Sequence, residues 1–249
     1  MVFDSILGVI SFLTIIPIPK SANLDINIVA KNMYLFPLVG ALIGIIVGIF
    51  AYFTSIFLAK DVTALLVTVV LMIITGLHHT DGLADFSDGL MVSGNKEIRK
   101  RVMSDPRIGS AGVVCLILYI VGLIIALSSF NSSVEMFIGI VIAEILSKYI
   151  MTLQAYKGRP AWEGLSSPFA QAMKNKGKFL ASTVITILFV WALGGFKGFM
   201  TLFVSLLIGL MIFYISKRKI AGISGDVLGA SNEIIRISSL LFLSIIILW

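Results

Sequence analysis

The sequence predicts an all-α, polytopic membrane helix bundle with six to seven transmembrane helices and an interfacial or half-spanning amino-terminal helix. Three observations predict this fold. Of the 249 residues, 58% are hydrophobic and only 13% are charged, whereas globular domains carry about 25% charged residues. The apolar residues lie in runs close to the roughly 20 residues needed to cross a bilayer. Lysine and arginine gather in alternate loops, as the positive-inside rule expects of membrane proteins.

The first apolar run, residues 1–19, resembles a signal peptide only superficially. Asp4 stands where a basic start is expected, no small-residue cleavage site follows, and Pro17 and Pro19 end the run. We therefore expect this segment to be retained as the interfacial or half-spanning helix.

Six later segments are long and apolar enough to span a membrane, and a shorter terminal segment makes the seventh. The predicted spans are 35–59, 62–78, 111–129, 134–153, 180–195 and 199–216, followed by 237–249. Short and long loops alternate between them, and the long polar loops are 79–110, 154–179 and 217–236. No repeat or linker divides the chain, so 1–249 is predicted to form a single membrane-embedded domain.

The charges predict an orientation. If every segment spans, 17 of the 19 lysines and arginines lie on the side of the long loops, and only Lys60 and Lys197 lie opposite. This distribution predicts a multi-pass membrane protein whose long loops face the cytoplasm. It also accounts for the net charge of +6 without a nucleic-acid partner. The single Cys115 leaves no intramolecular disulfide.

The stretch "LHHTDGLADFSDG" places an acidic stripe at the end of a predicted span. On a helix, Asp81, Asp85 and Asp88 fall within an arc of about 60°, His78 joins that face, and His79 points away. Carboxylates this close are tolerable when a cation or water offsets their repulsion. Oxygen-only ligands suit Mg²⁺, which leaves its other positions to water and substrate phosphates. The alternative is that these acids are solvated loop residues or helix caps.

The histidines of this stretch are less informative. Zinc is disfavoured because the chain has two histidines and one cysteine in an apolar run. His78 is a candidate substrate hydrogen bonder or general base, against the alternative of an interfacial histidine. Gly82 and Gly89 either allow a ligand to approach the backbone or belong to turns.

A second acidic cluster, "GISGDVLGASNE", lies on the same side. Asp226 and Glu233, seven residues apart, fall within about 20° on one helix face, and Gly225 and Gly229 leave room beside them. These acids are candidates to complete a metal site or to orient a nucleophile. The alternative is a helix start capped by Ser224 or Asp226.

The basic run "NKEIRKRVMSDPRIGSAG" offers Arg99, Arg101 and Arg107 as a clamp for a pyrophosphate. Arg107 is favoured because it lies in the "DPRIG" turn; the alternative is a topogenic run that meets lipid headgroups. Elsewhere, Glu144 and Lys148 have the spacing of a helical ion pair.

Several blocks, in this order, resemble the signatures of the cobalamin synthase (adenosylcobinamide-GDP ribazoletransferase) family. They are "TGLHHTDGLADFSDG", "MSDPRIGSAGV", "EGLSSPF" and "GISGDVLGASNE", preceded by "SFLTIIPIP" and "YLFPLVGALIG". The resemblance covers about Phe12 to Glu233. Two departures are Pro106, where many members have serine, and Glu144, which is not expected from the family pattern.

The resemblance implies a single membrane-embedded transferase domain of the inner cell membrane that joins adenosylcobinamide-GDP to α-ribazole or its 5′-phosphate. The product would be adenosylcobalamin or its 5′-phosphate, with release of GMP and a requirement for Mg²⁺. The family motifs fall on Asp81, Asp85 and Asp88, the expected catalytic and metal residues, and on Asp226 and Glu233. Membrane lipid is an expected partner, and assembly into a homo-oligomer is left open.

The residues expected to carry out this reaction are the arginines, glycines, acids and histidine described above. We expect Arg99, Arg101 and Arg107, with Gly82, Gly89, Gly225 and Gly229, to contact the substrate pyrophosphate and nucleotide, and Asp226, Glu233 or His78 to act as base. A CDP-alcohol phosphatidyltransferase is the nearest alternative, but its acidic pattern fails after "DGLAD". A transporter is less favoured, because transporter acids lie near the bilayer midplane.

Overall fold

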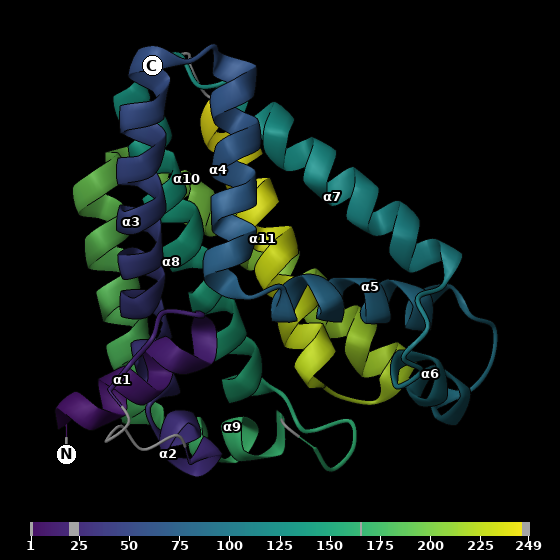
Figure 1. The fold of residues 1–249 in the computed structure, drawn as a ribbon. Coiled ribbons are helices and arrows are strands. Elements are labelled where there is room, and N and C mark those ends of the chain that lie inside the picture. The colour runs from purple at the N-terminus through teal and green to yellow at the C-terminus, as the bar shows by residue number, and fades with distance from the viewer. Residues whose placement is uncertain (1, 20–24, 165, 246–249) are drawn as a thin grey trace.

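The fold is entirely helical across the residues that the computed structural model describes, 2–19, 25–164 and 166–245 (Figure 1). These residues contain no β-strand, only an isolated bridge between Pro160 and Ile223, so the all-α prediction is confirmed. The elements are α1 Val2–Leu13, α2 Ile26–Lys31, the 3₁₀ turn η1 Met33–Leu35, α3 Phe36–Phe57, α4 Lys60–Thr75, α5 His78–Met91, α6 Lys96–Met103, α7 Ser110–Ser128, α8 Ser133–Lys157, α9 Ser166–Ala172, α10 Lys176–Ile220 and α11 Gly225–Ile245.

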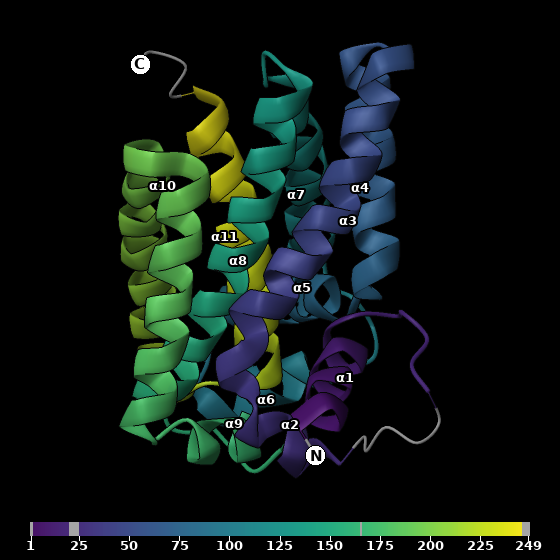
Figure 2. The ribbon, with the colours of Figure 1, turned by 90° about the vertical axis from the view of Figure 1, so that its left-hand side faces the viewer.

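The membrane bundle is built from five or six candidate spans. In the described residues, five helices are long and apolar enough to cross a membrane, namely η1 with α3, α7, α8, α10 and α11. Helices α4 and α5 pass the same test only together, as one bent pair, which makes six. The backbone of Gly195 is not helical, with φ of 52° and ψ of −133°, and α10 turns back there so that its two arms lie side by side (Figure 2). These two arms cover the predicted spans 180–195 and 199–216, and the helices agree with the predicted polytopic bundle.

Helix α5 does not continue the direction of α4. The chain bends by 93° between them, and α5 lies across the bundle near the end where α4 stops (Figure 1). The bend is made by two consecutive left-handed residues, Gly76 with φ of 70° and Leu77 with φ of 64°. Left-handed backbone is uncommon outside glycine, so Leu77 marks a bend that the surrounding structure enforces. The first acidic stretch therefore forms a helix that lies across the bundle instead of extending α4.

Helix α8 is the centre of the bundle. Its apolar stretch is 89% buried, whereas that of α7 is 28% buried and faces outward. Helix α3 approaches α8 through the glycine stripe: a Cβ atom on Gly44 would lie 2.6 Å from the Cα atom of Val141, and one on Gly48 would lie 2.6 Å from the ring of Phe137. Small residues of this kind allow close helix packing in lipid, where apolar burial drives little association.

The last helix begins earlier than predicted. The sequence indicated a polar loop over 217–236, but α11 starts at Gly225, so Asp226 and Glu233 belong to the bundle itself.

The buried positions of Lys148 and Arg236, 0% and 1% exposed, remove two charges from the loop face. Among the 18 lysines and arginines of the described residues, 14 remain on that face. Residues 246–249 of the predicted terminal span lie outside the described residues.

The amino-terminal helix α1 is 12 residues long, which corresponds to about 18 Å. This length is too short to cross the hydrocarbon core and fits the half-spanning prediction. The Phe12 ring lies 6.1 Å from that of Phe36 and 5.1 Å from that of Phe169, so α1 closes one side of the bundle.

Candidate active site

The acidic residues of α5 lie on one face, as the spacing predicted. Asp81 is exposed, and Asp85 and Asp88 are half-buried. Burial, followed by the charges of Asp81, Asp226 and Asp88, raises the pKa of Asp85 to about 7. The carboxylates of α5 and α11 therefore act on one another, and a bound cation would relieve their repulsion.

Two glycines let α5 and α11 cross at very short range. A Cβ atom on Gly82 would lie 2.9 Å from the Cα atom of Asp226, and one on Gly229 would lie 3.1 Å from the Cα atom of His79. Both neighbours are backbone atoms, which cannot move aside without separating the helices. Gly82 and Gly229 thus bring the two acidic segments together, a packing role that the sequence did not indicate.

Asp88 is held by the start of α7. Its Oδ2 accepts a hydrogen bond from the amide of Gly109 at 2.7 Å, and its Oδ1 accepts one from the amide of Gly112 at 2.9 Å. The side chain from another helix therefore caps α7, whose own N-cap residue, Gly109, has none. A Cβ atom on either glycine would lie within 2.7 Å of an Asp88 oxygen. Both oxygens of Asp88 are thus engaged by the protein.

The three candidate arginines differ in their freedom to bind a ligand. Arg99 is buried and donates from Nη1 to the carbonyl oxygens of Gly89 at 2.6 Å and Leu90 at 2.8 Å, which fastens α6 to the end of α5. Arg107 donates to Asp105 from Nε at 3.0 Å and Nη2 at 2.8 Å, and its side chain is 87% exposed. Arg101 is exposed.

The remaining predicted glycines have different surroundings. Gly89 lies against α6, where a Cβ atom would meet the Met103 side chain at 2.5 Å. Gly225 lines a cavity together with Asp226. Ser224 donates to Asp226 Oδ2 at 3.1 Å and accepts from the amide of Val227, so it caps α11, as the alternative interpretation of this segment proposed.

A cavity of about 450 Å³ opens between α1, α3, α5, α8, α9 and α11. Its polar wall carries residues of both acidic segments and two serines, and the rest of the lining is mostly apolar. The lining residues are Ser11, Phe12, Met33, Phe36, His78, His79, Asp81, Met151, Ser166, Phe169, Gly225, Asp226 and Leu228. The lining therefore combines a mainly apolar chamber with two carboxylates, Asp81 and Asp226.

His79 is a candidate that the sequence missed. The helical spacing pointed it away from the aspartates, yet it lines the cavity together with His78. It is 9% exposed, and its Nδ1 has no hydrogen-bond partner in the described part of the chain. Burial, aided by Lys148 and Arg236, lowers the pKa of His79 well below its usual value, so its ring is neutral. No sequence pattern signals this, because the 93° bend before α5 determines which side of its first turn faces the cavity.

Glu233 lies away from the cavity in a buried ionic network. It pairs with Arg236, accepts a hydrogen bond from Tyr119, and accepts another from Asn232 at 3.0 Å. Arg236 also pairs with Glu144, and Glu144 pairs with Lys148 at 2.7 Å, which confirms the predicted ion pair. Two carboxylates meet two cations, so the network is neutral. Glu233 is one of the predicted bases, but among the described residues its carboxylate contacts this network and not the residues that line the cavity.

The loop between α8 and α9, the predicted substrate-contacting segment, is tied to the start of α11. The amide of Ala161 donates to Ile223 O at 2.8 Å, and the amide of Ile223 donates to Arg159 O at 2.9 Å. Lys100 of α6 lies over the Trp162 ring, 5.5 Å from its centroid. These contacts hold the loop at the same end of the bundle as α5.

The donor set suits Mg²⁺ more than a metal that needs a preformed cage. Among the described residues no three histidine, cysteine or acidic side chains converge as a ready metal site. Mg²⁺ is usually held by one or two carboxylates, with water and substrate phosphates in its other positions. Asp81 and Asp85, near Asp226, supply that chemistry, whereas Asp88 has both oxygens hydrogen-bonded to α7.

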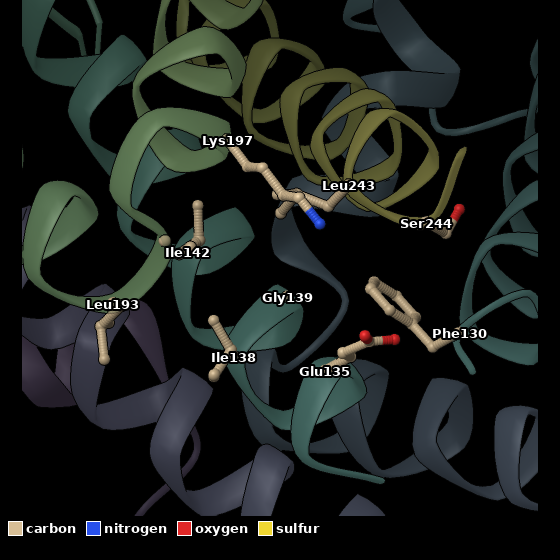
Figure 3. A pocket seen from close by; sticks show the side chains of 10 residues that line it. Phe130, Glu135, Ile138, Gly139, Ile142, Leu193, Lys197, Leu243 and Ser244 are labelled. Atoms are coloured by element: carbon tan, nitrogen blue, oxygen red, sulfur yellow. The ribbon is translucent and has the colours of Figure 1, made fainter. Parts of the chain in front are cut away.

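A smaller cavity at the far end of the bundle is unlike the first. It has a volume of about 170 Å³ and is lined by the start of α8, the turn of α10 and the end of α11 (Figure 3). Glu135 and Lys197 are its charged residues, and the other lining side chains are mainly apolar. This cavity has no acidic cluster, so the reactive chemistry is concentrated around α5.

Comparison with known proteins gives a consistent result. A profile of the family described as cobalamin-5-phosphate synthase matches residues 5–244. A Methanococcoides burtonii protein named adenosylcobinamide-GDP ribazoletransferase is 34% identical over 95% of this chain and 90% of its own. Proteins of the same name from Clostridium tetani and Methanocella arvoryzae are 32% and 31% identical, each over 93% of this chain and over 92% and 91% of their own lengths. No solved structure matches.

Proposed function

The chain belongs to the cobalamin-5-phosphate synthase family, and we propose that it joins adenosylcobinamide-GDP to α-ribazole or its 5′-phosphate in the final assembly of cobalamin. The observation that carries the proposal is the crossing at Gly82 and Gly229, which brings Asp81, Asp85 and Asp226 together beside an apolar cavity.

In this reaction a hydroxyl of the ribazole attacks the phosphorus bound to cobinamide. A new phosphorus–oxygen bond forms, the bond to the GMP phosphate breaks, and the hydroxyl proton passes to a base. Asp226 is the proposed base because it lines the cavity next to Asp81, and His78 lines the same cavity. Glu233 is not proposed, since Arg236, Tyr119 and Asn232 occupy its carboxylate.

Asp81 and Asp85 are the proposed protein ligands of Mg²⁺. Oxygen atoms of the substrate pyrophosphate would be further ligands of the same ion. When bound, Mg²⁺ supplies charge that stabilises the departing phosphate. Asp88 positions α7 and with it the turn that carries Arg107. Asp88 and Arg107 line one hollow of about 330 Å³, where Arg107 is placed to contact pyrophosphate oxygens.

We also propose that the end of the bundle carrying α5 faces the cytoplasm. Of the 18 lysines and arginines among the described residues, 14 lie there, because Lys148 and Arg236 belong to the core and Lys60 and Lys197 lie at the other end. The substrates would then reach the site from the compartment that holds nucleotides. A CDP-alcohol transferase and a transporter gain no support from the matched relatives, which carry the transferase name.

The test is to incubate purified protein with adenosylcobinamide-GDP, α-ribazole and Mg²⁺, and to measure GMP and the cobamide product. We expect both products in equal amounts, and neither with a chelator. Asp85→Ala should abolish transfer while melting near the wild-type temperature, because the Asp85 side chain makes no hydrogen bond or ion pair with another described residue. Near-normal turnover of that variant would refute the metal assignment, and CMP release from a CDP-lipid without GMP release would refute the transferase assignment.

A further inference from the structure

We propose that the 450 Å³ cavity holds the aromatic base of the acceptor nucleoside, and that His79 Nδ1 forms a hydrogen bond with the ring nitrogen of that base. The proposal rests on the proposed function. It adds the position of the acceptor and a residue that selects it.

The apolar wall suits a flat ring. Phe12, Phe36 and Phe169 lie within 5.1 to 6.1 Å of one another, centroid to centroid, and come from α1, α3 and α9. Met33 and Met151 complete the apolar wall and adapt readily to an aromatic edge. The volume falls in the range of small-molecule sites, about 300 to 1,000 Å³. This chamber admits a bicyclic base, whereas a corrin ring with its side chains is too bulky.

The polar wall suits the sugar of the same molecule. Asp81, Asp226 and His78 line the same cavity as the phenylalanines. A nucleoside has an apolar ring at one end and hydroxyls at the other, so its two ends match the two walls. With the base among the rings, a ribose hydroxyl comes to lie beside the acid that removes its proton.

His79 supplies the specific contact. It is 9% exposed, and its Nδ1 has no partner in the described residues. Buried polar atoms are rarely left unpaired, so an orphan in a cavity wall indicates a bond completed by a ligand. An N–H at Nδ1 of the imidazole would donate to the unsubstituted ring nitrogen of a benzimidazole. The backbone of Gly229 fixes His79, since even a Cβ atom there would lie 3.1 Å from the His79 Cα atom.

The first experiment compares His79→Leu, which removes the hydrogen bond, with His79→Asn, whose amide lies near the Nδ1 position. We expect the KM for α-ribazole to rise about tenfold in His79→Leu, equivalent to about 1.4 kcal/mol, and to recover largely in His79→Asn. The KM for adenosylcobinamide-GDP should stay the same in both. Equal KM values for α-ribazole in His79→Leu and the wild type would overturn the proposal.

A second experiment removes the hydrogen-bond partner from the acceptor instead of from the protein. An acceptor with the ring nitrogen replaced by CH should lose about tenfold in kcat/KM with the wild type and nothing further with His79→Leu. Equal losses in both proteins would show that the nitrogen does not meet His79.

Direct binding separates this proposal from the transferase assignment. Calorimetry of α-ribazole with wild-type protein in nanodiscs, without the GDP substrate, should show binding that Phe169→Leu weakens and Phe203→Leu leaves unchanged. Phe203 is 52% exposed on the outside of α10 and is the matched control. If α-ribazole binds but the complete reaction releases no GMP, the transferase assignment is refuted and the proposed base site is not. A lipid retained in the cavity and not displaced by α-ribazole would refute the base site alone.

Discussion

Gly82 on α5 lies directly against the backbone of Asp226 on α11. A Cβ atom on Gly82 would be 2.9 Å from the Cα atom of Asp226 and 3.1 Å from its carbonyl oxygen. No side-chain rotation relieves contacts with backbone atoms, so the distance between the acids of the two helices depends on the absence of one methyl group.

Gly82→Ala should therefore separate α5 from α11. We expect a loss of about 1–3 kcal/mol in the free energy of unfolding, as for other overpacked positions, and a loss of transfer activity of more than tenfold. Thermal unfolding in detergent and GMP release measure the two effects. Gly177→Ala is the control, because Gly177 lies in the exposed first turn of α10 and only the Asn175 side chain is near. Wild-type melting and activity of Gly82→Ala would contradict the packing role.

Asp88 and Asp85 should respond in opposite ways to the same substitution. Asp88→Asn turns one acceptor toward Gly109 or Gly112 into a donor and should lower the free energy of unfolding by about 1–3 kcal/mol. Asp85→Asn removes a crowded charge and should leave the melting temperature unchanged or raise it, while transfer is lost. Similar melting temperatures for the two variants would mean that Asp88 does not cap α7.

The sequence-based predictions succeeded where the periodicity is local. Membrane segments and the Glu144–Lys148 pair follow from spacing along one helix, and α5 has its acids on one face because it is a regular helix. Spacing along one segment says less where two distant segments meet. Glu233 and Asp226 share a helix, but only Asp226 lines the cavity, because Arg236 and Tyr119 from the core engage Glu233. The approach of α5 to α11 depends on a bend and a helix crossing, which no single-segment pattern records.

The pH dependence of stability should report the raised pKa of Asp85. The pKa of Asp85 is about 7 in the folded protein and 3.8 in the unfolded chain. Between about pH 4 and pH 7 the folded protein therefore retains a proton on Asp85 that the unfolded chain has lost. Stability contributed by this group is thus present at low pH and decreases as pH rises to about 7. Melting temperatures measured with a chelator should fall over this range more steeply in the wild type than in Asp85→Asn. Parallel pH profiles would contradict the shift.

The buried ionic network should be sensitive to charge balance more than to the loss of any one bond. Arg236 pairs with both Glu144 and Glu233, so Arg236→Met leaves two carboxylates in the core with only Lys148 to offset them. Breaking a buried pair by removing one partner costs about 3–5 kcal/mol, so we expect this variant to melt far below the wild type or to fail to fold.

The double variant Glu144→Gln with Lys148→Met removes one charge of each sign and leaves Glu233 paired with Arg236. Although it changes two buried residues, we expect it to melt closer to the wild type than either single variant does, because no uncompensated charge stays in the core. A double-mutant cycle of unfolding in detergent gives the coupling energy directly. Additive losses would show that the two side chains act independently, whereas a favourable coupling would identify the network as a neutral unit that locks α8 to α11 behind the site.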